Sequence, residues 1–429
     1  MASIEWVPRG DEFQMYLDRF CSRPEAAIAL LCLALLLPSP SDGATLRVPD
    51  DHATIQAGLD ASQPGDTVLV APGTYRGSGN RSIVFPGWDL VVRSEGGADV
   101  TILDVQGSGQ NPGRGFLFTG DETPATVLEG FTIENGWMST QEDRPEDGFA
   151  GGTGAGTGVG AGVGSGTGAT AAAGRAGLTQ SLDSRHDLSG AGFKVNFGAP
   201  TIRKLVIRHC HSEYTGGGAS VEAAASPKIS DISIENCSAG IQGGGISIET
   251  GSTAQVENSS FIGNFAPLGG GVANHATVIM VGCTIAGNRA EYGGGVALYA
   301  FTVGTYERTL IWGNCASADG DQIWTDNGAG GLTLQCSLAD PAGVVESNPG
   351  TVVWNDSVTA DPMFCDPIPC SQAPFSGGDF SLSTESPALP AGSPCGALIG
   401  ALQYGTCNVS PYRSWGRIKA GFLKAGKNP

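Results

Sequence analysis

The chain has 429 residues, of which 67 are glycine and only 15% are charged, and its formal net charge is −19. Such an acidic chain lacks the basic stripe that nucleic-acid binding requires, so nucleic acid is excluded as an expected partner. A hydrophobic content of 40% suits a folded chain with a thin core.

The first predicted element is a leader that directs export. Residues 26–37 are a run of apolar residues that follows Arg19 and Arg23 and precedes a stretch of proline and serine. The run is too short to span a bilayer and is typical of a secretory signal, with a buried helix as the alternative. We predict a signal peptide and leader over residues 1–41. The mature chain is then expected to be secreted or at the cell surface of a bacterium, without a transmembrane segment.

A short helix is predicted next, near the start of the mature chain. Ile55 and Leu59 lie four residues apart, as on one face of an amphipathic helix, and Asp50 or Asp51 could cap it. Gly58 weakens the prediction because glycine disfavours helix interiors. We expect this helix to cover the open first coil of the repeats that follow.

A Gly-Gly-Gly triplet recurs four times between residues 216 and 295, and successive triplets start 27, 26 and 24 residues apart. The residues after each triplet alternate, as in Ile246-Ser247-Ile248-Glu249, which indicates strands. A unit of this length has no room for a crossover helix. The predicted fold is therefore all-β: a right-handed parallel β-helix with a short N-terminal capping helix.

Two columns of the repeat have structural interpretations. The triplet glycines are expected to turn the backbone through positive φ at a corner. Asn264, Asn288 and Asn314 occupy one repeat position, where stacked amides can hydrogen-bond to one another inside the coil. Cys210 and Cys237 occupy the same position one coil apart, so a disulfide and a pair of stacked free thiols both remain open.

Between two recognisable coils lies an insert rich in small residues. Residues 148–176 are almost wholly Gly, Ala, Thr, Val and Ser, a composition that cannot bury a core. We predict a Gly-rich insert at about 138–192, forming a loop at one corner. A basic tail is predicted over residues 408–429, either solvated or acting as a sorting or membrane-surface tag.

Several segments resemble known β-helix families. Residues 54–57, 64–68 and 72–75 resemble the opening of proteins with the pectin-lyase-like fold. The repeats are similar to those of polymorphic outer-membrane proteins, since Phe261-Ile262-Gly263-Asn264 has their Phe-x-x-Asn element, whereas other coils have Ile for Phe and two have Cys for Asn. Residues 360–364, 379–382 and 386–388 look like the closing module of secreted bacterial β-helix proteins. The resemblance covers most of residues 45–407 and implies fold and export rather than an activity.

Cysteine usage agrees with export. Two of the 11 cysteines lie in the leader, and the odd number left requires at least one unpaired or intermolecular thiol. Cys365, Cys370, Cys395 and Cys407 cluster in the C-terminal part and allow three pairings. The spacings do not form a zinc pattern, so no metal site is predicted.

One row of side chains is the candidate ligand-binding site. The fourth residue after each triplet should point outward, which predicts an exposed column of Glu222, Glu249, His275 and Tyr299. Carboxylates, an imidazole and a phenol in one line could grip a sugar or a cation, although a polar face without a role is the alternative. Asn274 should point inward and need a hydrogen-bond partner. Trp312 and Trp324 could add aromatic platforms or pack in the core.

Signatures of the enzymes with this fold are missing. The Gly-His-Gly element of polygalacturonases is absent, and Arg417-Ile418-Lys419 stands alone in the tail. We therefore identify no catalytic residue and no cofactor. The predicted function is a secreted or cell-surface, monomeric β-helix protein with a non-catalytic binding or adhesion surface, for carbohydrate or a surface protein.

The alternative is a polysaccharide lyase or another carbohydrate-active enzyme acting on acidic glycans. Glu222 and Glu249 would then hold a Ca²⁺ that neutralises a uronate, and His275 or Tyr299 would act as the base.

Overall fold

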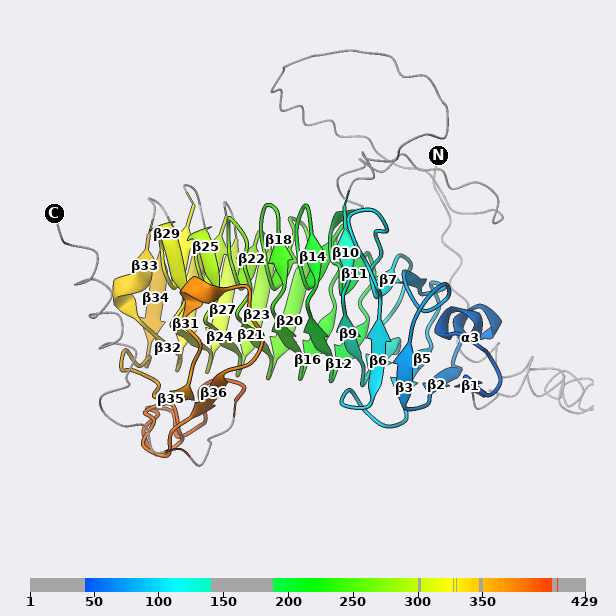
Figure 1. Ribbon diagram of the computed structural model, residues 1–429. Helices are drawn as coiled ribbons and strands as arrows, with labels where there is room; N and C mark the ends of the chain where they lie inside the picture. Colours follow the sequence, from blue (N-terminus) through cyan, green and yellow to red (C-terminus); the bar gives the residue numbers. More distant parts are fainter. Residues whose placement is uncertain are drawn as a thin grey trace, which may run out of the picture. The chain divides into compact units, whose positions relative to one another are not determined.

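The repeats stack as coils of a right-handed parallel β-helix in the computed structural model (Figure 1). The structure describes residues 43–139, 188–299, 302–326, 328, 330–346, 350–402 and 407. The predicted leader, the basic tail and residues 140–187 of the predicted insert lie outside these residues, so the predicted domain boundaries remain predictions. The all-β parallel β-helix prediction is confirmed.

Three long parallel sheets run along the coils. Sheet A contains β1 (Thr45–Val48), β2 (Thr67–Val70), β5 (Val91–Ser94), β8 (Val127–Glu129), β12 (Thr201–Arg203), β16 (Lys228–Ser230), β20 (Thr253–Glu257), β23 (Thr277–Val281), β27 (Val303–Glu307), β31 (Gly331–Gln335) and β34 (Val352–Asn355). Sheet B contains β3 (Gly73–Tyr75), β6 (Thr101–Asp104), β9 (Thr132–Glu134), β13 (Val206–Arg208), β17 (Ser233–Glu235), β21 (Ser260–Ile262), β24 (Thr284–Ala286), β28 (Leu310–Trp312) and β32 (Leu338–Ala339). Sheet C contains β4 (Ile83–Val84), β7 (Phe116–Phe118), β11 (Phe193–Asn196), β15 (Ala219–Glu222), β19 (Ile246–Ile248), β22 (Val272–Asn274), β26 (Val296–Leu298), β30 (Ile323–Thr325) and β33 (Val344–Val345).

Shorter strands complete the coils between sheets B and C. They are β10 (Trp137–Met138), β14 (His211–Ser212), β18 (Ser238–Ala239), β25 (Arg289–Tyr292) and β29 (Cys315–Asp319). Each coil thus visits sheets A, B and C in turn, and five coils add a strand between sheets B and C. Strands of the three long sheets pair in parallel with their counterparts one coil away.

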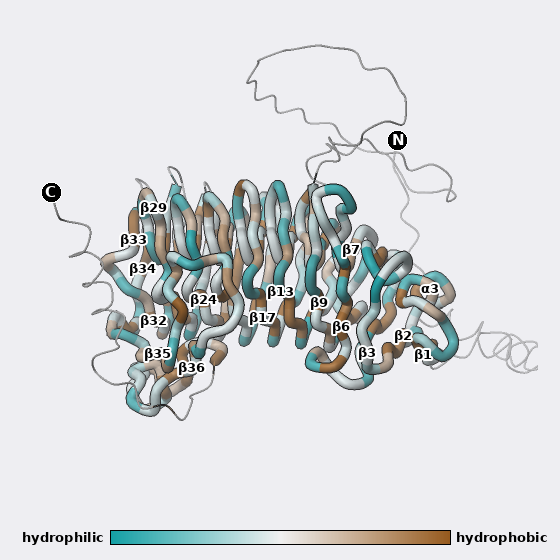
Figure 2. Tube along the Cα trace, viewed as in Figure 1, coloured by the Kyte–Doolittle hydropathy of each residue, from teal (hydrophilic) through white to brown (hydrophobic). Residues whose placement is uncertain are grey.

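The core is a stack of inward-pointing apolar side chains. Ile207, Ile234, Phe261 and Ile285 lie in register on successive strands of sheet B, and all four are fully buried. Each such side chain contributes about 1.5–3 kcal/mol by leaving water. Figure 2 shows hydrophobic residues interleaved with polar ones along the coils, as expected from strands with one buried face.

The triplet glycines turn the corner before sheet C. The first glycine of each triplet has a positive φ, as predicted, and is 65° in Gly243. The second allows close packing between coils, because a Cβ on Gly244 would lie 2.5 Å from the carbonyl oxygen of Gly270. Both positions therefore require glycine for a structural reason.

The predicted amide column is confirmed. Asn264 Nδ2 donates to Asn288 Oδ1 over 3.1 Å, and Asn288 Nδ2 donates to Asn314 Oδ1 over 2.9 Å. Cys210 and Cys237 extend this column as buried free thiols, so the alternative of stacked thiols holds and the disulfide is wrong. Cys237 takes the place of an asparagine in this column. Its backbone N–H donates to Asn264 Oδ1 over 3.0 Å, which links it to the next coil.

The predicted N-terminal helix is α3 (Ile55–Ala61). Its N-cap is Thr54, whose hydroxyl accepts from the backbone N–H of Ala57 over 3.2 Å, so the predicted cap at Asp50 or Asp51 is wrong.

Gly58 brings α3 close to the first coils. A Cβ at this position would lie 3.0 Å from the Val68 side chain on β2 and 3.2 Å from the Val48 side chain on β1. The glycine that weakened the helix prediction therefore allows the helix to pack against β1, β2 and β4 at the start of the solenoid.

The C-terminal part folds back over the outer face of sheet B. It contains the antiparallel strands β35 (Phe364–Asp366) and β36 (Asp379–Leu382) and a 3₁₀ turn at Cys370–Gln372. Phe375 and Phe380 pack with Ile262 and Trp312 in a second apolar cluster, so Trp312 is a packing residue rather than an aromatic platform. Phe375 N–H also donates to the Gly263 carbonyl over 2.9 Å.

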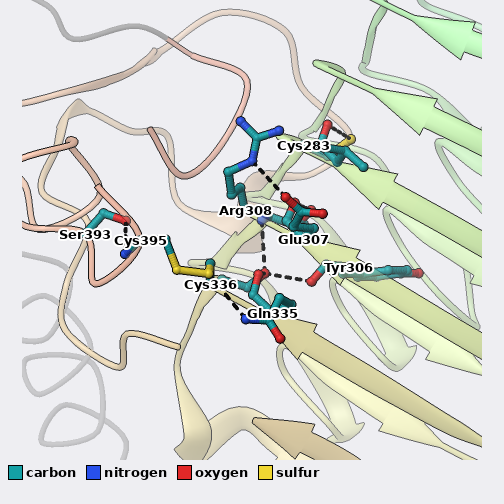
Figure 3. Close-up of polar contacts among 11 residues, drawn as sticks. Cys283, Tyr306, Glu307, Arg308, Gln335, Cys336, Ser393 and Cys395 are labelled. Atoms are coloured by element: carbon teal, nitrogen blue, oxygen red, sulfur yellow. Dashed lines mark hydrogen bonds and ion pairs between the residues drawn. A yellow bond between two sulfur atoms is a disulfide. The ribbon is translucent and has the colours of Figure 1, made fainter. Parts of the chain in front are cut away.

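Disulfides fix this module to the solenoid. Cys315–Cys370 and Cys336–Cys395 join the module to the coils, and Cys365–Cys407 lies within the C-terminal part. Figure 3 shows the second of these pairs at the corner that carries Arg308 and Glu307. The expectation that the four C-terminal cysteines pair among themselves is therefore met for only one bond.

Candidate functional site

Residues at the ends of the sheet C strands form one row, as the repeat register predicted. Glu249 N–H donates to the Val221 carbonyl over 2.8 Å, and His275 N–H donates to the Ile248 carbonyl over 2.9 Å. Tyr299 continues the same ladder one coil further on. Neighbouring positions are therefore about 4.8 Å apart. We call Glu222, Glu249, His275, Tyr299 and Asp326 the sheet C row.

Asp326 belongs to this row although the sequence analysis missed it. Its N–H donates to the Leu298 carbonyl over 2.8 Å, which is the contact that places the other members. The glycine triplet that marks this position in the other coils is replaced here by Gly320-Asp321-Gln322, so the sequence pattern does not identify Asp326.

Glu222 does not have the predicted exposure. Only 3% of it is exposed, and its Oε2 lies 2.9 Å from Lys194 Nζ. Burial raises the pKa of the carboxyl, but the ammonium of Lys194 and hydrogen bonds from Ser189 and Ser220 outweigh burial and hold the pKa below its usual value. Glu222 is therefore a buried, ionised structural group, and the prediction that it lines an exposed column is wrong.

An aromatic cluster surrounds the centre of the row. The rings of His275 and Tyr299 stack with centroids 3.6 Å apart and planes inclined by 13°. Trp324 meets Tyr299 edge-on at 6.1 Å and lies 5.3 Å from Tyr292. All four side chains are half-buried, so each ring keeps part of its surface accessible.

Protonation states follow from burial. Burial lowers the pKa of His275, and the opposing effect of Glu249 and Asp326 does not reverse this shift. Burial also raises the pKa of the Tyr299 phenol well above its ordinary value, and the same two carboxylates add to the rise. At neutral pH the row therefore presents a neutral imidazole and a protonated phenol. Neither His275 Nε2 nor the Tyr299 hydroxyl has a hydrogen-bond partner among the described residues.

Glu249 is held in place by its own coil. Its Oε1 accepts from Gln242 Nε2 over 3.1 Å and from Ser247 Oγ over 2.5 Å. Gln242 precedes the glycine triplet and Ser247 follows it, so the corner built by the triplet positions this carboxylate. The other carboxylate oxygen of this half-buried residue has no hydrogen-bond partner within the described chain and is available to a ligand.

His275 lies at the shortest connection between sheets C and A in this region. Only His275 and Ala276 join β22 to β23, whereas residues 249–252 join β19 to β20 and residues 299–302 join β26 to β27. The tight link is fixed by Asn274, whose inward Oδ1 accepts from Ala276 N–H over 2.9 Å. The predicted need of Asn274 for an internal partner is thus met at its oxygen.

The chemistry of the row does not fit a divalent cation. Within the described part of the chain, no three His, Cys, Asp or Glu side chains gather as metal ligands. Glu222, predicted to share a cation with Glu249, is bound to the ammonium of Lys194. The Ca²⁺ arrangement considered for a lyase is therefore not formed by these two residues.

Comparison with known proteins identifies the class of fold. A family model for the right handed beta helix region matches residues 167–339. The protein is a right-handed parallel β-helix protein. The curated proteins gave no match.

Two solved structures are distantly similar. A PL6 family alginate lyase, in a mutant form, is 13% identical with a TM-score of 0.37, covering 72% of this chain and 40% of that one. An alginate lyase from a Paenibacillus species is 13% identical with a TM-score of 0.34, covering 74% of this chain and 99% of that one. The chain thus spans less than half the length of the first. Similarities this remote do not assign an activity.

Proposed function

We propose that the protein is an extracellular carbohydrate-binding β-helix protein that uses the sheet C row as a non-catalytic binding surface. The observation that carries the proposal is the stacked His275–Tyr299 pair, in which the buried His275 Nε2 and Tyr299 hydroxyl have no hydrogen-bond partner in the described chain. Sugar hydroxyls both donate and accept hydrogen bonds, and aromatic rings offer faces to the apolar side of a sugar. Trp324 supplies such a ring beside the pair.

The charges of the row select the kind of glycan. Glu249 and Asp326 flank the aromatic pair, and the hydrogen bonds that position Glu249 come from the neutral side chains of Gln242 and Ser247. Placing a uronate beside these carboxylates would be unfavourable, since like charges repel. The proposed ligands are therefore neutral or amino sugars.

An extracellular location is part of the proposal. Disulfides form and persist in oxidising compartments, and this chain carries three in its C-terminal half. In the part of the chain that the structure describes, no helix is long and apolar enough to cross a membrane.

Truncating the aromatic rings should weaken glycan binding. We expect Tyr299→Ala and Trp324→Ala each to lower affinity at least tenfold, about 1.4 kcal/mol, because each removes a ring face. The measurement is retention of the purified protein on immobilised neutral, amino-sugar and acidic polysaccharides. Ile279→Ala, on the outer face of sheet A where Ile279 is 44% exposed, should bind like wild type. Equal retention of all three variants would remove the row as the binding surface.

A lyase remains the second candidate because His275 is neutral and could accept a proton. Tyr299 is disfavoured as the base, since its phenol stays protonated. We expect no rise in absorbance from unsaturated products when acidic polysaccharides are incubated with the protein, with or without Ca²⁺. Product that disappears in His275→Ala, with an unchanged unfolding transition, would replace the binding proposal by the enzymatic one.

A further inference from the structure

A concave surface lies at the corner between sheets A and B, separate from the sheet C row. It is a cavity of about 650 Å³, within the usual range for ligand sites. Residues 94–99 form one wall. Most of them belong to the six-residue link between β5 and β6, which is longer than the two-residue links of the following coils. Ala401 and Leu402 of the C-terminal module form the other wall. We call this cavity the corner trough.

The floor of the trough is a row of equivalent corner residues. Gly130, Lys204, Asp231 and Asn258 each open a two-residue link from sheet A to sheet B on successive coils. All four have a positive φ, of 85°, 53°, 54° and 48°. The three with side chains are exposed, so the floor presents an ammonium, a carboxylate and an amide.

The lining excludes several ligand classes. Among the residues that the structure describes, no aromatic side chain lines it, so these residues offer a flat aromatic cofactor no stacking partner. Glu95, Asp99 and Asp231 outnumber the one ammonium, of Lys204, which already lies 2.6 Å from Glu129. A polyanion is therefore disfavoured, whereas a neutral or weakly cationic ligand with many hydroxyl groups can use these donors and acceptors together with Ser233.

The spacing of the floor separates a sugar chain from a peptide. Successive corners repeat at the strand spacing of about 4.8 Å. An extended peptide advances about 3.3 Å per residue and falls out of step with this row. A linear chain of pyranose rings advances by one ring and one glycosidic oxygen per unit, a repeat close to the spacing of the coils.

We propose that the corner trough binds a linear oligosaccharide of neutral or amino sugars, one sugar unit per coil, at a site separate from the sheet C row. The ligand class rests on the proposed function, but the site and its residues do not. The trough gives the protein two glycan contacts on different corners of one solenoid, which raises avidity for a long polymer.

The test removes the floor side chains without disturbing the corner. Asp231→Gly/Asn258→Gly is suited to this, because Gly130 and Gly282 already occupy the same corner position with positive φ. Arg308→Gly is the matched control, since Arg308 has a φ of 47° at the same corner but does not line the trough. Binding of cellohexaose, a glucosamine hexamer and hexagalacturonate is measured by calorimetry on the full chain, with Tyr299→Ala in parallel.

We expect the double glycine variant to bind the neutral or the glucosamine hexamer at least tenfold more weakly at one of two sites, and Arg308→Gly to bind like wild type. Tyr299→Ala should remove the other site. Loss only in Tyr299→Ala would overturn the trough and keep the proposed function, whereas loss only in the glycine variant would do the reverse. No binding of any hexamer would overturn the trough as a glycan site.

Discussion

Replacing Asn288 by alanine is expected to lower the free energy of unfolding by about 3–5 kcal/mol. Asn288 is fully buried, and its Nδ2 donates to the Phe261 carbonyl and to Asn314 Oδ1, each over 2.9 Å. Its Oδ1 accepts from both the backbone N–H and Nδ2 of Asn264. Alanine would remove all four of these hydrogen bonds and leave the Asn264 backbone N–H without its side-chain acceptor in a place that water does not reach. Asn264 Nδ2 would keep the Ile234 carbonyl, and Asn314 Oδ1 would keep the backbone N–H of residue 288. Each buried group left without a partner costs about 1–3 kcal/mol.

The column also suggests a substitution whose cost in unfolding free energy should lie between wild type and alanine. Asn288→Cys should cost less than alanine, because Cys237 already fills the same position and its thiol approaches the Ile207 carbonyl as the amides approach their carbonyls. Chemical denaturation of the full chain measures the change, with Asn355→Ala as control, since Asn355 is exposed on the last strand of sheet A. A cost below about 1 kcal/mol for Asn288→Ala would show that the amides contribute little.

The amide column was predictable because it repeats with the coil. A side chain that returns every 24 to 27 residues must stack on itself in a parallel solenoid, so the position of Asn264 implies that of Asn288. The same logic predicts that Glu249, His275 and Tyr299 lie in one row, as the structure shows.

Features that break the repeat were not predictable. Glu222 is in register with its row, yet it is buried beside Lys194, which lies one strand away on β11 and follows the Gly-rich insert in the sequence. The pairing of Cys315 with Cys370 depends on how the C-terminal module folds back over sheet B, and repeat periodicity carries no information on that contact. The corner trough was missed for the same reason, since its walls are a long link and the end of that module.

Removing one partner of the Lys194–Glu222 pair should destabilise the protein by about 3–5 kcal/mol, because the remaining charge is left buried. Both side chains are 4% exposed and 2.9 Å apart. Lys194→Met and Glu222→Gln should therefore each lower the denaturation midpoint, whereas Lys194→Met/Glu222→Leu should recover most of the loss, since an apolar pair leaves no uncompensated charge. Glu307→Gln, in an exposed pair with Arg308, should cost less than about 1 kcal/mol.

The pair also sets a pH dependence with a definite sign. The pKa of Glu222 lies below its ordinary value of 4.5 in the folded protein, so below that value the unfolded chain takes up the proton more readily than the folded one. The stabilisation is then fully present above pH 4.5 and is lost as the pH falls through the lowered folded pKa. Stability measured between neutral pH and strong acid should consequently fall more steeply in wild type than in Lys194→Met/Glu222→Leu. Parallel curves for the two proteins would mean that Glu222 is not held ionised by Lys194.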